Sequence, residues 1–162
     1  VRVLSGVCDP VIVALGYHAD AIRPAIERTA TIVTNPAPER GQLSSLQTAL
    51  AALPSEACGF LFTPVDSPAV ELATVELLAG EFLRRDPATL FVIPRYRGQR
   101  GHPVFAVRAI ADEFLALPSS GQAREVVHCH VLETAYIDVE DPGILVDIDD
   151  HLAYRLITES AP

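Results

Sequence analysis

Short β-rich runs alternate with longer segments of helical periodicity, and this alternation constrains the fold more than any other feature of the chain. Such a pattern is typical of a parallel or mixed sheet with helices on both faces. The expected strands are residues 11–16, 30–34, 59–63, 90–93, 104–107, 133–139 and 144–147. The expected helices are roughly residues 19–28, 42–53, 72–85, 109–117 and 122–127, with a last one from about Asp150. The sequence therefore predicts an α/β fold.

Length and charge narrow the possible functions. The 162 residues have the size of one domain, and no repeat or linker divides residues 1–162. A net charge of −9 disfavours nucleic acid as a partner, because phosphate backbones bind to surfaces rich in Lys and Arg. No apolar run is long enough to span a membrane. The cysteines Cys8, Cys58 and Cys129 form no zinc or redox motif, so we expect reduced, mostly buried thiols in a cytoplasmic protein.

Two acidic segments follow expected strands. Asp66 comes just after the buried strand at residues 59–63, and Asp147 and Asp149 lie where a later strand is expected to end. In open α/β sheets ligands bind at the carboxyl ends of strands, and carboxylates converging there suit Mg²⁺ and a phosphate substrate. The alternative for each aspartate is to cap a helix or turn.

The segment Arg95-Tyr96-Arg97-Gly98-Gln99-Arg100-Gly101-His102-Pro103 concentrates positive charge in what the sequence predicts to be a loop. Arginine forks match phosphate geometry, so such a loop is suited to an anionic substrate. The alternative is a solvated surface loop. His102, held between Gly101 and Pro103, is more specific than the arginines, although a single histidine is more often structural than catalytic.

Two further segments contain polar groups that suit a ligand. Ser44 and Ser45 open an expected helix after Gly41, where amides and hydroxyls suit a nucleobase or phosphate, or where a serine is an ordinary N-cap. The triplet His128-Cys129-His130 is a weak metal motif, because no partner cluster lies at a suitable spacing.

Taken together and in order, several segments resemble the MobA-like nucleotidyltransferases, and most closely the molybdenum cofactor cytidylyltransferase branch. The segments are Leu15-Gly16-Tyr17-His18, residues 41–50, Val65-Asp66-Ser67-Pro68, Arg100-Gly101-His102-Pro103-Val104, Gly121-Gln122-Ala123-Arg124 and residues 141–149. The resemblance covers nearly the whole chain, and its Gly-His-Pro and Asp-Pro-Gly elements are the most specific.

The resemblance implies a Rossmann-like three-layer sandwich with a mostly parallel sheet. It also implies transfer of CMP or GMP from a nucleoside triphosphate to molybdopterin, with release of pyrophosphate. Asp66 and Asp149 would be the catalytic Mg²⁺ ligands, with Asp147 as the alternative second ligand. Ser44 and Ser45 would lie beside the nucleobase, and Arg100, Gly101 and His102 would face the acceptor.

The resemblance also carries an expectation about the N-terminus. Family members begin with a strand and a glycine-rich phosphate loop, whereas Val1 already matches the helix that follows them, and the sequence contains no Met. We therefore expect about 35 to 40 preceding residues, the usual length of a strand, loop and helix unit.

The resemblance also suggests a molybdoenzyme or its chaperone as a protein partner. Two alternative functions stay open. One is a sugar-phosphate or methylerythritol phosphate nucleotidyltransferase of the same fold, and the other is a non-catalytic nucleotide-binding or partner-docking module.

Overall fold

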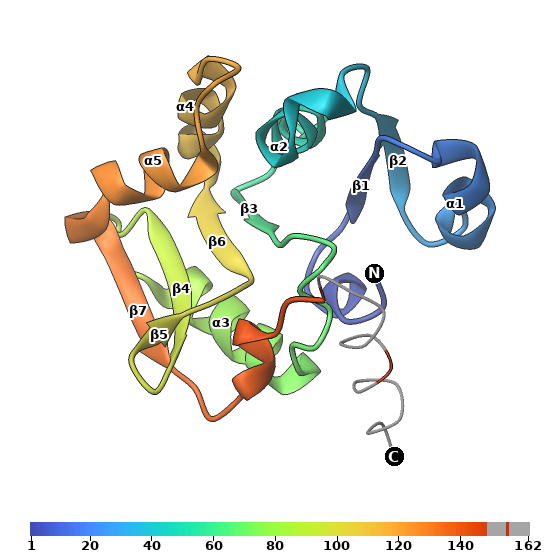
Figure 1. Cartoon of the computed structure of the whole chain (residues 1–162). Helices are drawn as coiled ribbons and strands as arrows, with labels where there is room; N and C mark the ends of the chain where they lie inside the picture. The colour runs from blue at the N-terminus through green and yellow to red at the C-terminus, as the bar shows by residue number, and fades with distance from the viewer. Residues whose placement is uncertain (149–154, 156–162) are drawn as a thin grey trace.

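The computed structural model describes residues 1–148 and Arg155, and arranges its strands in two sheets (Figure 1). In the smaller sheet, β1 (Ile12–Leu15) pairs in parallel with β2 (Thr31–Thr34). In the larger sheet, β3 (Gly59–Phe62), β6 (Val104–Val107) and β4 (Phe91–Tyr96) are consecutive neighbours. Both β5 (Gln99–Arg100) and β7 (Thr134–Asp138) also pair with β4.

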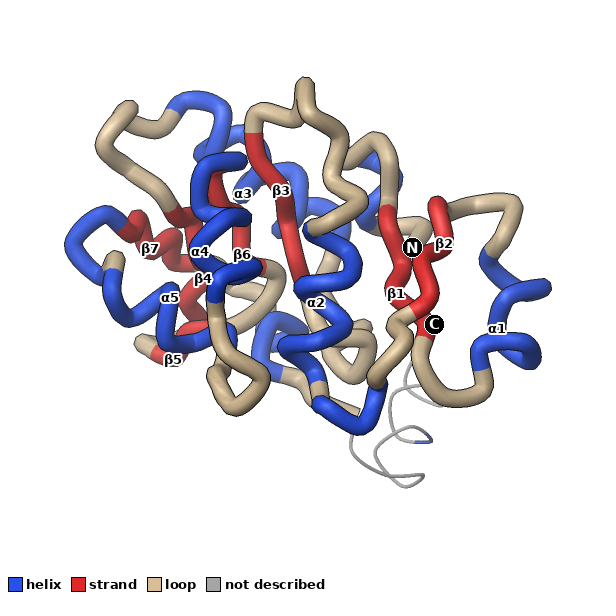
Figure 2. The backbone as a smooth tube through the Cα atoms, turned by 90° about the horizontal axis from the view of Figure 1, so that it is seen from above, coloured by secondary structure: helices blue, strands red, loops and turns tan. Residues whose placement is uncertain are grey.

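Helices cover both faces of the larger sheet, as expected from the sequence (Figure 2). They are α2 (Gln42–Leu50), α3 (Leu72–Arg84), α4 (Ala111–Ala116) and α5 (Ala123–Cys129). The remaining helix, α1 (Ala19–Ile26), lies beside the smaller sheet and contacts β1. Short 3-10 helices are η1 (Leu4–Gly6), η2 (Pro38–Arg40), η3 (Arg108–Ile110), η4 (Val131–Glu133) and η5 (Pro142–Leu145). Residues of α2, α4 and α5 pack into one core cluster, and residues of α3 pack into the other.

Aromatic and aliphatic side chains fix the two layers. On one face, the fully buried Phe114 of α4 makes edge-to-face contacts with Phe60, Phe62 and Phe91, at centroid distances of 6.1, 5.5 and 6.4 Å. On the other face, α3 places Val75 and Leu78 at a helical spacing against the sheet, and both are fully buried. These contacts fix α4 and α3 on opposite faces of the sheet.

The strand directions correct one expectation, because the larger sheet is mostly antiparallel. Pairs β3–β6, β4–β6 and β4–β5 are antiparallel, and only β4–β7 is parallel. The cause is a two-residue turn at Arg97 and Gly98, with φ of 48° and 83°, which is the conformation of a tight hairpin. The arginine-rich segment is therefore a hairpin that returns the chain beside β4, where the sequence predicted a loop.

The expected strand at residues 144–147 is also wrong. Pro142–Leu145 form the 3-10 helix η5, because the Asp141 side chain accepts a hydrogen bond of 2.7 Å from the Gly143 amide and turns the backbone. Asp147 thus follows a helical turn. The helix expected from Asp150 lies outside the described residues.

Two smaller expectations are also tested by the fold. All three cysteines are free, but Cys58 and Cys129 are exposed, so the expected burial is wrong for both. Cys8 is half-buried, and burial raises the pKa of its thiol. Within residues 1–148, no helix has the length and apolar character required to cross a membrane.

Candidate active site

The loop after β3 and the segment after η5 meet at one edge of the larger sheet. The Ile148 amide donates to the Asp66 carbonyl at 2.7 Å, and the Ser67 hydroxyl donates to Asp147 Oδ1 at 2.7 Å. Asp66 does not cap α3, whose N-cap residue is Glu71. Two acidic residues separated by about eighty positions in sequence are thereby joined through their neighbours, whereas Asp149 lies outside the described residues.

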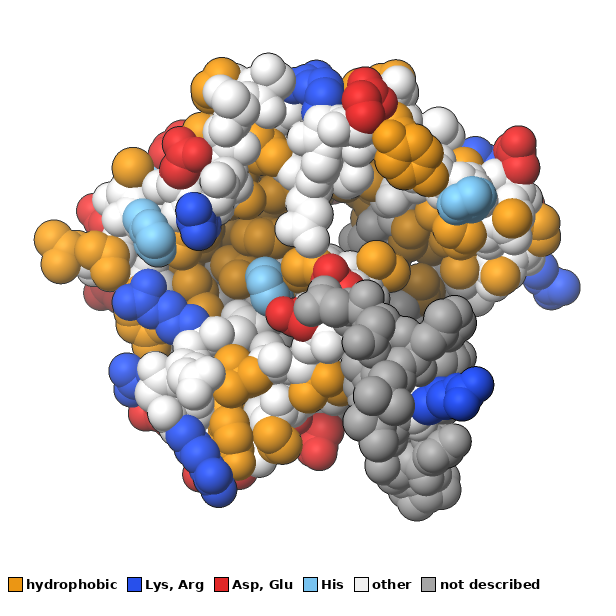
Figure 3. All heavy atoms as spheres, viewed as in Figure 1, with side chains coloured by type: hydrophobic (Ala, Val, Ile, Leu, Met, Phe, Trp, Pro, Cys, Tyr) orange, Lys and Arg blue, Asp and Glu red, His pale blue; other side chains and the backbone are white. Residues whose placement is uncertain are grey.

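His102 lies at this same edge, because β6 begins where β3 ends and Val104 pairs with Phe62. Burial lowers the pKa of His102, while the negative charges of Asp147 and Asp66 act against that shift. Its Nδ1 atom is buried and has no hydrogen-bond partner among the described residues. Acidic and histidine side chains gather in the middle of the face seen in Figure 3, which locates a polar site there.

The lowered pKa of His102 leads to a testable pH dependence. We expect its ring to titrate below the ordinary value of 6.5, measured from the Cε1 proton by NMR. The unfolded chain then binds the proton more readily than the folded one, so the free energy of unfolding should decrease as pH falls below the ordinary value of 6.5. A His102→Gln variant should show a weaker pH dependence between pH 7 and 5. An unchanged dependence would assign it to other groups.

Gly101 occupies a position where a side chain has no room. A Cβ atom there would lie 2.2 Å from the Ile144 carbonyl oxygen, and the adjacent His102 amide donates to that oxygen at 3.0 Å. The glycine therefore lets the hairpin approach η5 closely. This backbone contact is enough to explain the Gly-His part of the motif, and the explanation does not require a bound ligand.

The arginines of the hairpin have different surroundings. Arg95 forms a bidentate ion pair with Asp138 of β7, in which Nε and Nη2 donate to the two carboxylate oxygens at 2.6 and 2.8 Å. This pair raises the pKa of Arg95 and lowers that of Asp138. Arg97 lies over the Tyr96 ring, and Arg100 lies over the Tyr136 ring. Arg100 ends β5, and His102 follows two residues later. The charge of Arg95, in contrast, is neutralised by its ion pair with Asp138.

Ser44 and Ser45 lie at the start of α2 beside the loop that follows β2. Asn35 donates through its side-chain amide to the Ser44 and Ser45 hydroxyl oxygens, at 2.8 and 3.1 Å. The buried Ser44 hydroxyl also approaches the carbonyls of Gly41 and Ala37, so it has protein partners. Ser45 is the more accessible of the two.

Sequence reasoning missed two residues of this region, Asn35 and Asp141. Besides its bond to Gly143, the buried Asp141 carboxylate accepts from the Glu71 amide at 2.9 Å and so joins η5 to the start of α3. Asn35 organises the turn before α2. Their only sequence signal was a turn-forming residue directly before a proline.

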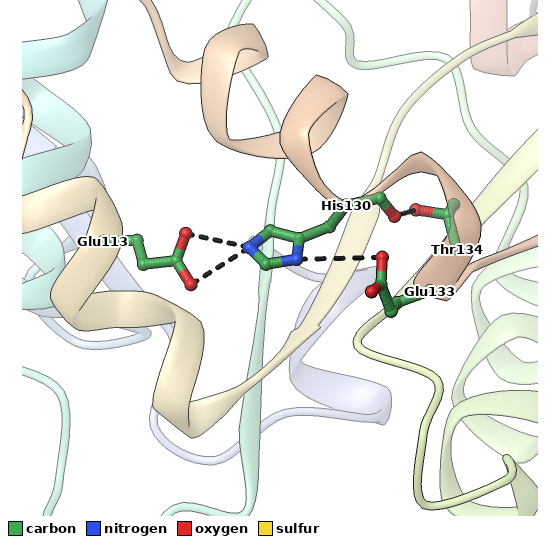
Figure 4. A network of polar contacts seen from close by, with 4 residues as sticks. All are labelled: Glu113, His130, Glu133 and Thr134. Carbon is green, nitrogen blue, oxygen red and sulfur yellow. Dashed lines mark hydrogen bonds and ion pairs between the residues drawn. The ribbon is translucent and has the colours of Figure 1, made fainter.

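The triplet His128-Cys129-His130 does not join the site. The Nε2 atom of His130 contacts both carboxylate oxygens of Glu113, at 3.0 and 2.8 Å, and its Nδ1 atom lies 3.9 Å from Glu133 (Figure 4). These contacts tie α4 to the connection between α5 and β7. Among residues 1–148 and 155, no group of three or more His, Cys, Asp or Glu side chains is arranged to hold a metal.

An α/β fold with carboxylates and a half-buried histidine at one end of its sheet has polar groups where such folds bind ligands. The chain belongs to the MobA-like NTP transferase domain family, which matches residues 1–135. It is similar to molybdenum cofactor cytidylyltransferase of Escherichia coli K12, with 26% identity over 145 residues. That match covers 88% of this chain and 70% of the relative.

Solved structures share the fold of this chain. Rv0371c from Mycobacterium tuberculosis H37Rv aligns with a TM-score of 0.78 and 26% identity, covering 99% of this chain and 82% of that one. Its complex with manganese aligns with a TM-score of 0.74 and 26% identity, covering 99% and 83%. A nucleotidyl transferase from Methanothermobacter shares the fold, with a TM-score of 0.78 and 23% identity over 97% and 75% of the two chains.

Proposed function

We propose that this chain is the body of a cytoplasmic, Mg²⁺-dependent nucleotidyltransferase that transfers CMP, or GMP, from a nucleoside triphosphate to molybdopterin. The observation that carries the proposal is the junction of the Asp66 loop with the Asp147 segment beside His102. The similarity to a molybdenum cofactor cytidylyltransferase supports the acceptor. A molybdoenzyme or its chaperone as partner stays a prediction.

The donor chemistry of the edge fits a divalent cation. Asp66 and Asp147 offer hard carboxylate oxygens, and one oxygen of Asp147 is already oriented by Ser67. Magnesium is usually bound through one or two carboxylates together with substrate phosphates, so a complete protein cage is not required. Asp149 is our proposed second catalytic ligand, with Asp147 as the alternative. The bound ion would neutralise phosphate charge and orient the reacting phosphates.

The remaining residues would bind and orient the two substrates. Ser45, with Ser44 behind it, is proposed to lie beside the nucleobase at the start of α2. Arg100 and His102, on either side of Gly101, are proposed to hold the terminal phosphate of the acceptor. Positioning of this kind supplies much of the rate enhancement in phosphoryl transfer.

The direct test is pyrophosphate release by the full-length protein with each nucleoside triphosphate, Mg²⁺ or Mn²⁺, and molybdopterin. We expect release that depends on the metal and on molybdopterin, with CTP or GTP as donor. Release with a sugar phosphate or methylerythritol phosphate in place of molybdopterin would assign the rival transferase. Nucleotide binding without any release would indicate a non-catalytic module.

The acceptor assignment makes a separate prediction. Replacing Arg100 and His102 together by Ala should raise the KM for the acceptor or lower kcat by roughly ten- to a hundredfold. The reason is that a charge-assisted bond to phosphate contributes about 1.5 to 3 kcal/mol. Nucleotide affinity, measured by calorimetry, should stay nearly unchanged. A loss in nucleotide affinity alone would reverse the assignment, and equal losses would mean that the hairpin shapes the whole site.

A further inference from the structure

Two arginines lie directly opposite each other at the outer end of the larger sheet. Arg100 of β5 is the antiparallel partner of Arg95 in β4, and Arg95 is in register with Asp138 of β7. Like charges opposite each other on paired strands repel. Asp138 offsets this repulsion, because its carboxylate binds the Arg95 guanidinium through both oxygens.

Arg100 has a different environment. It is exposed and forms no ion pair with the residues that the structure describes. Its guanidinium carbon lies 4.5 Å from the centroid of the Tyr136 ring, which is two positions before Asp138 on β7. Stacking uses the flat face of a guanidinium and leaves its N–H groups, which point outward in the plane, free to bind an anion.

The Tyr136 side chain is held by the hydrophobic core. It packs against the core cluster that contains Phe91 and Ile93, and its hydroxyl oxygen is buried. That hydroxyl has no hydrogen-bond partner among the described residues. The contact with Arg100 is therefore made by the face of the ring, and the hydroxyl forms no hydrogen bond with Arg100.

We propose that Tyr136 is a positioning residue for the acceptor phosphate, because its ring holds the Arg100 guanidinium flat with its N–H edge open to the anion. Asp138 supports this role by keeping Arg95 in a separate ion pair. The inference rests on the proposed function for the role of Arg100, but the stacking that it invokes is a property of the protein alone.

The kinetic test compares Tyr136→Leu with Tyr136→Phe in the full-length enzyme. The Leu variant removes the stacking surface, so the KM for the acceptor should rise roughly three- to tenfold, the size of an exposed to partly desolvated cation–π contact. The KM for the nucleotide and kcat should change little. The Phe variant keeps the ring, so it should retain the wild-type acceptor KM and be at least as stable in denaturant.

A double-mutant comparison separates positioning from general damage to the fold. In an Arg100→Ala background, Tyr136→Leu should have no further effect on the acceptor KM, because the group that it positions is gone. An equal additional rise in that background, or equal rises for the Phe and Leu variants, would overturn the inference.

A measurement without turnover distinguishes failure of this inference from failure of the proposed function. In NMR spectra of the full-length protein, the ring current of Tyr136 should shift the Arg100 side-chain signals. This shift should persist in Tyr136→Phe and vanish in Tyr136→Leu. Inorganic phosphate should perturb the Arg100 signals at lower concentration in the wild type than in the Leu variant. Absence of pyrophosphate release would contradict the proposed function, whereas absence of the ring-current shift would contradict the role of Tyr136.

Discussion

An Asp66→Asn variant of the full-length enzyme should release pyrophosphate at least about a hundredfold more slowly than the wild type. The substitution removes one negative charge at nearly constant volume, from the loop that meets the Asp147 segment. Groups that hold a metal or stabilise transition-state charge typically contribute effects of this size. The measurement is kcat for pyrophosphate release at saturating Mg²⁺, together with calorimetric titration of Mg²⁺ and Mn²⁺.

Asp112→Asn is a matched control, because it removes the same charge from an exposed position of α4. It should leave kcat and metal affinity unchanged. Circular dichroism and denaturant unfolding should be the same for both variants, since the Asp66 backbone contact to Ile148 does not depend on the side chain. Turnover of Asp66→Asn close to that of the control would remove Asp66 from the site.

The second large effect is expected from Gly143→Ala. A Cβ atom at residue 143 would lie 2.2 Å from the Ala69 carbonyl oxygen and 2.7 Å from Asp141 Oδ1, so η5 must move away from the Asp66 loop. Overpacking a tight contact costs about 1 to 3 kcal/mol, which denaturant unfolding would detect as a lower midpoint. Because the shift also carries Asp147 away from Ser67, turnover should fall with stability.

Gly80→Ala supplies the comparison for this variant. Its Cβ would meet the end of the Arg84 side chain at 3.2 Å, and that side chain is exposed and can move. Alanine is favoured over glycine inside a helix by about 0.5 to 1 kcal/mol, so this variant should be as stable as the wild type or slightly more stable. A Gly143→Ala protein with the stability and turnover of Gly80→Ala would show that η5 can shift without separating the two acidic segments.

The sequence predicted most of the secondary structure because local periodicity decides it. Helix α3 begins at Leu72 and ends at Arg84, as the apolar spacing predicted. Strands β1, β2, β3 and β6 lie within one or two residues of their expected positions. The two errors lie where side-chain or turn geometry overrides pattern, namely the hairpin at Arg97 and Gly98 and the 3-10 helix after Asp141.

For the candidate site, too, the sequence predicted one part and could not predict another. The ordered motifs along the chain, with Val65-Asp66-Ser67-Pro68 and Arg100-Gly101-His102-Pro103-Val104 among them, were enough to indicate the family that the family match then confirmed. What the sequence could not decide is which charges are free, because that depends on partners far away along the chain. Asp138 neutralises Arg95 from 43 positions away, and Asn35 binds both serines across a turn.

Local sequence by itself therefore determined the alternation of strands and helices and the chemical types present at the sheet edge, since both follow from neighbouring residues. Only the tertiary structure decided the antiparallel return of β6, the contact between the Asp66 loop and the Asp147 segment, and the stacking of Arg100 on Tyr136. The physical reason is that strand direction and side-chain pairing depend on contacts between distant segments, which periodicity along the chain does not encode.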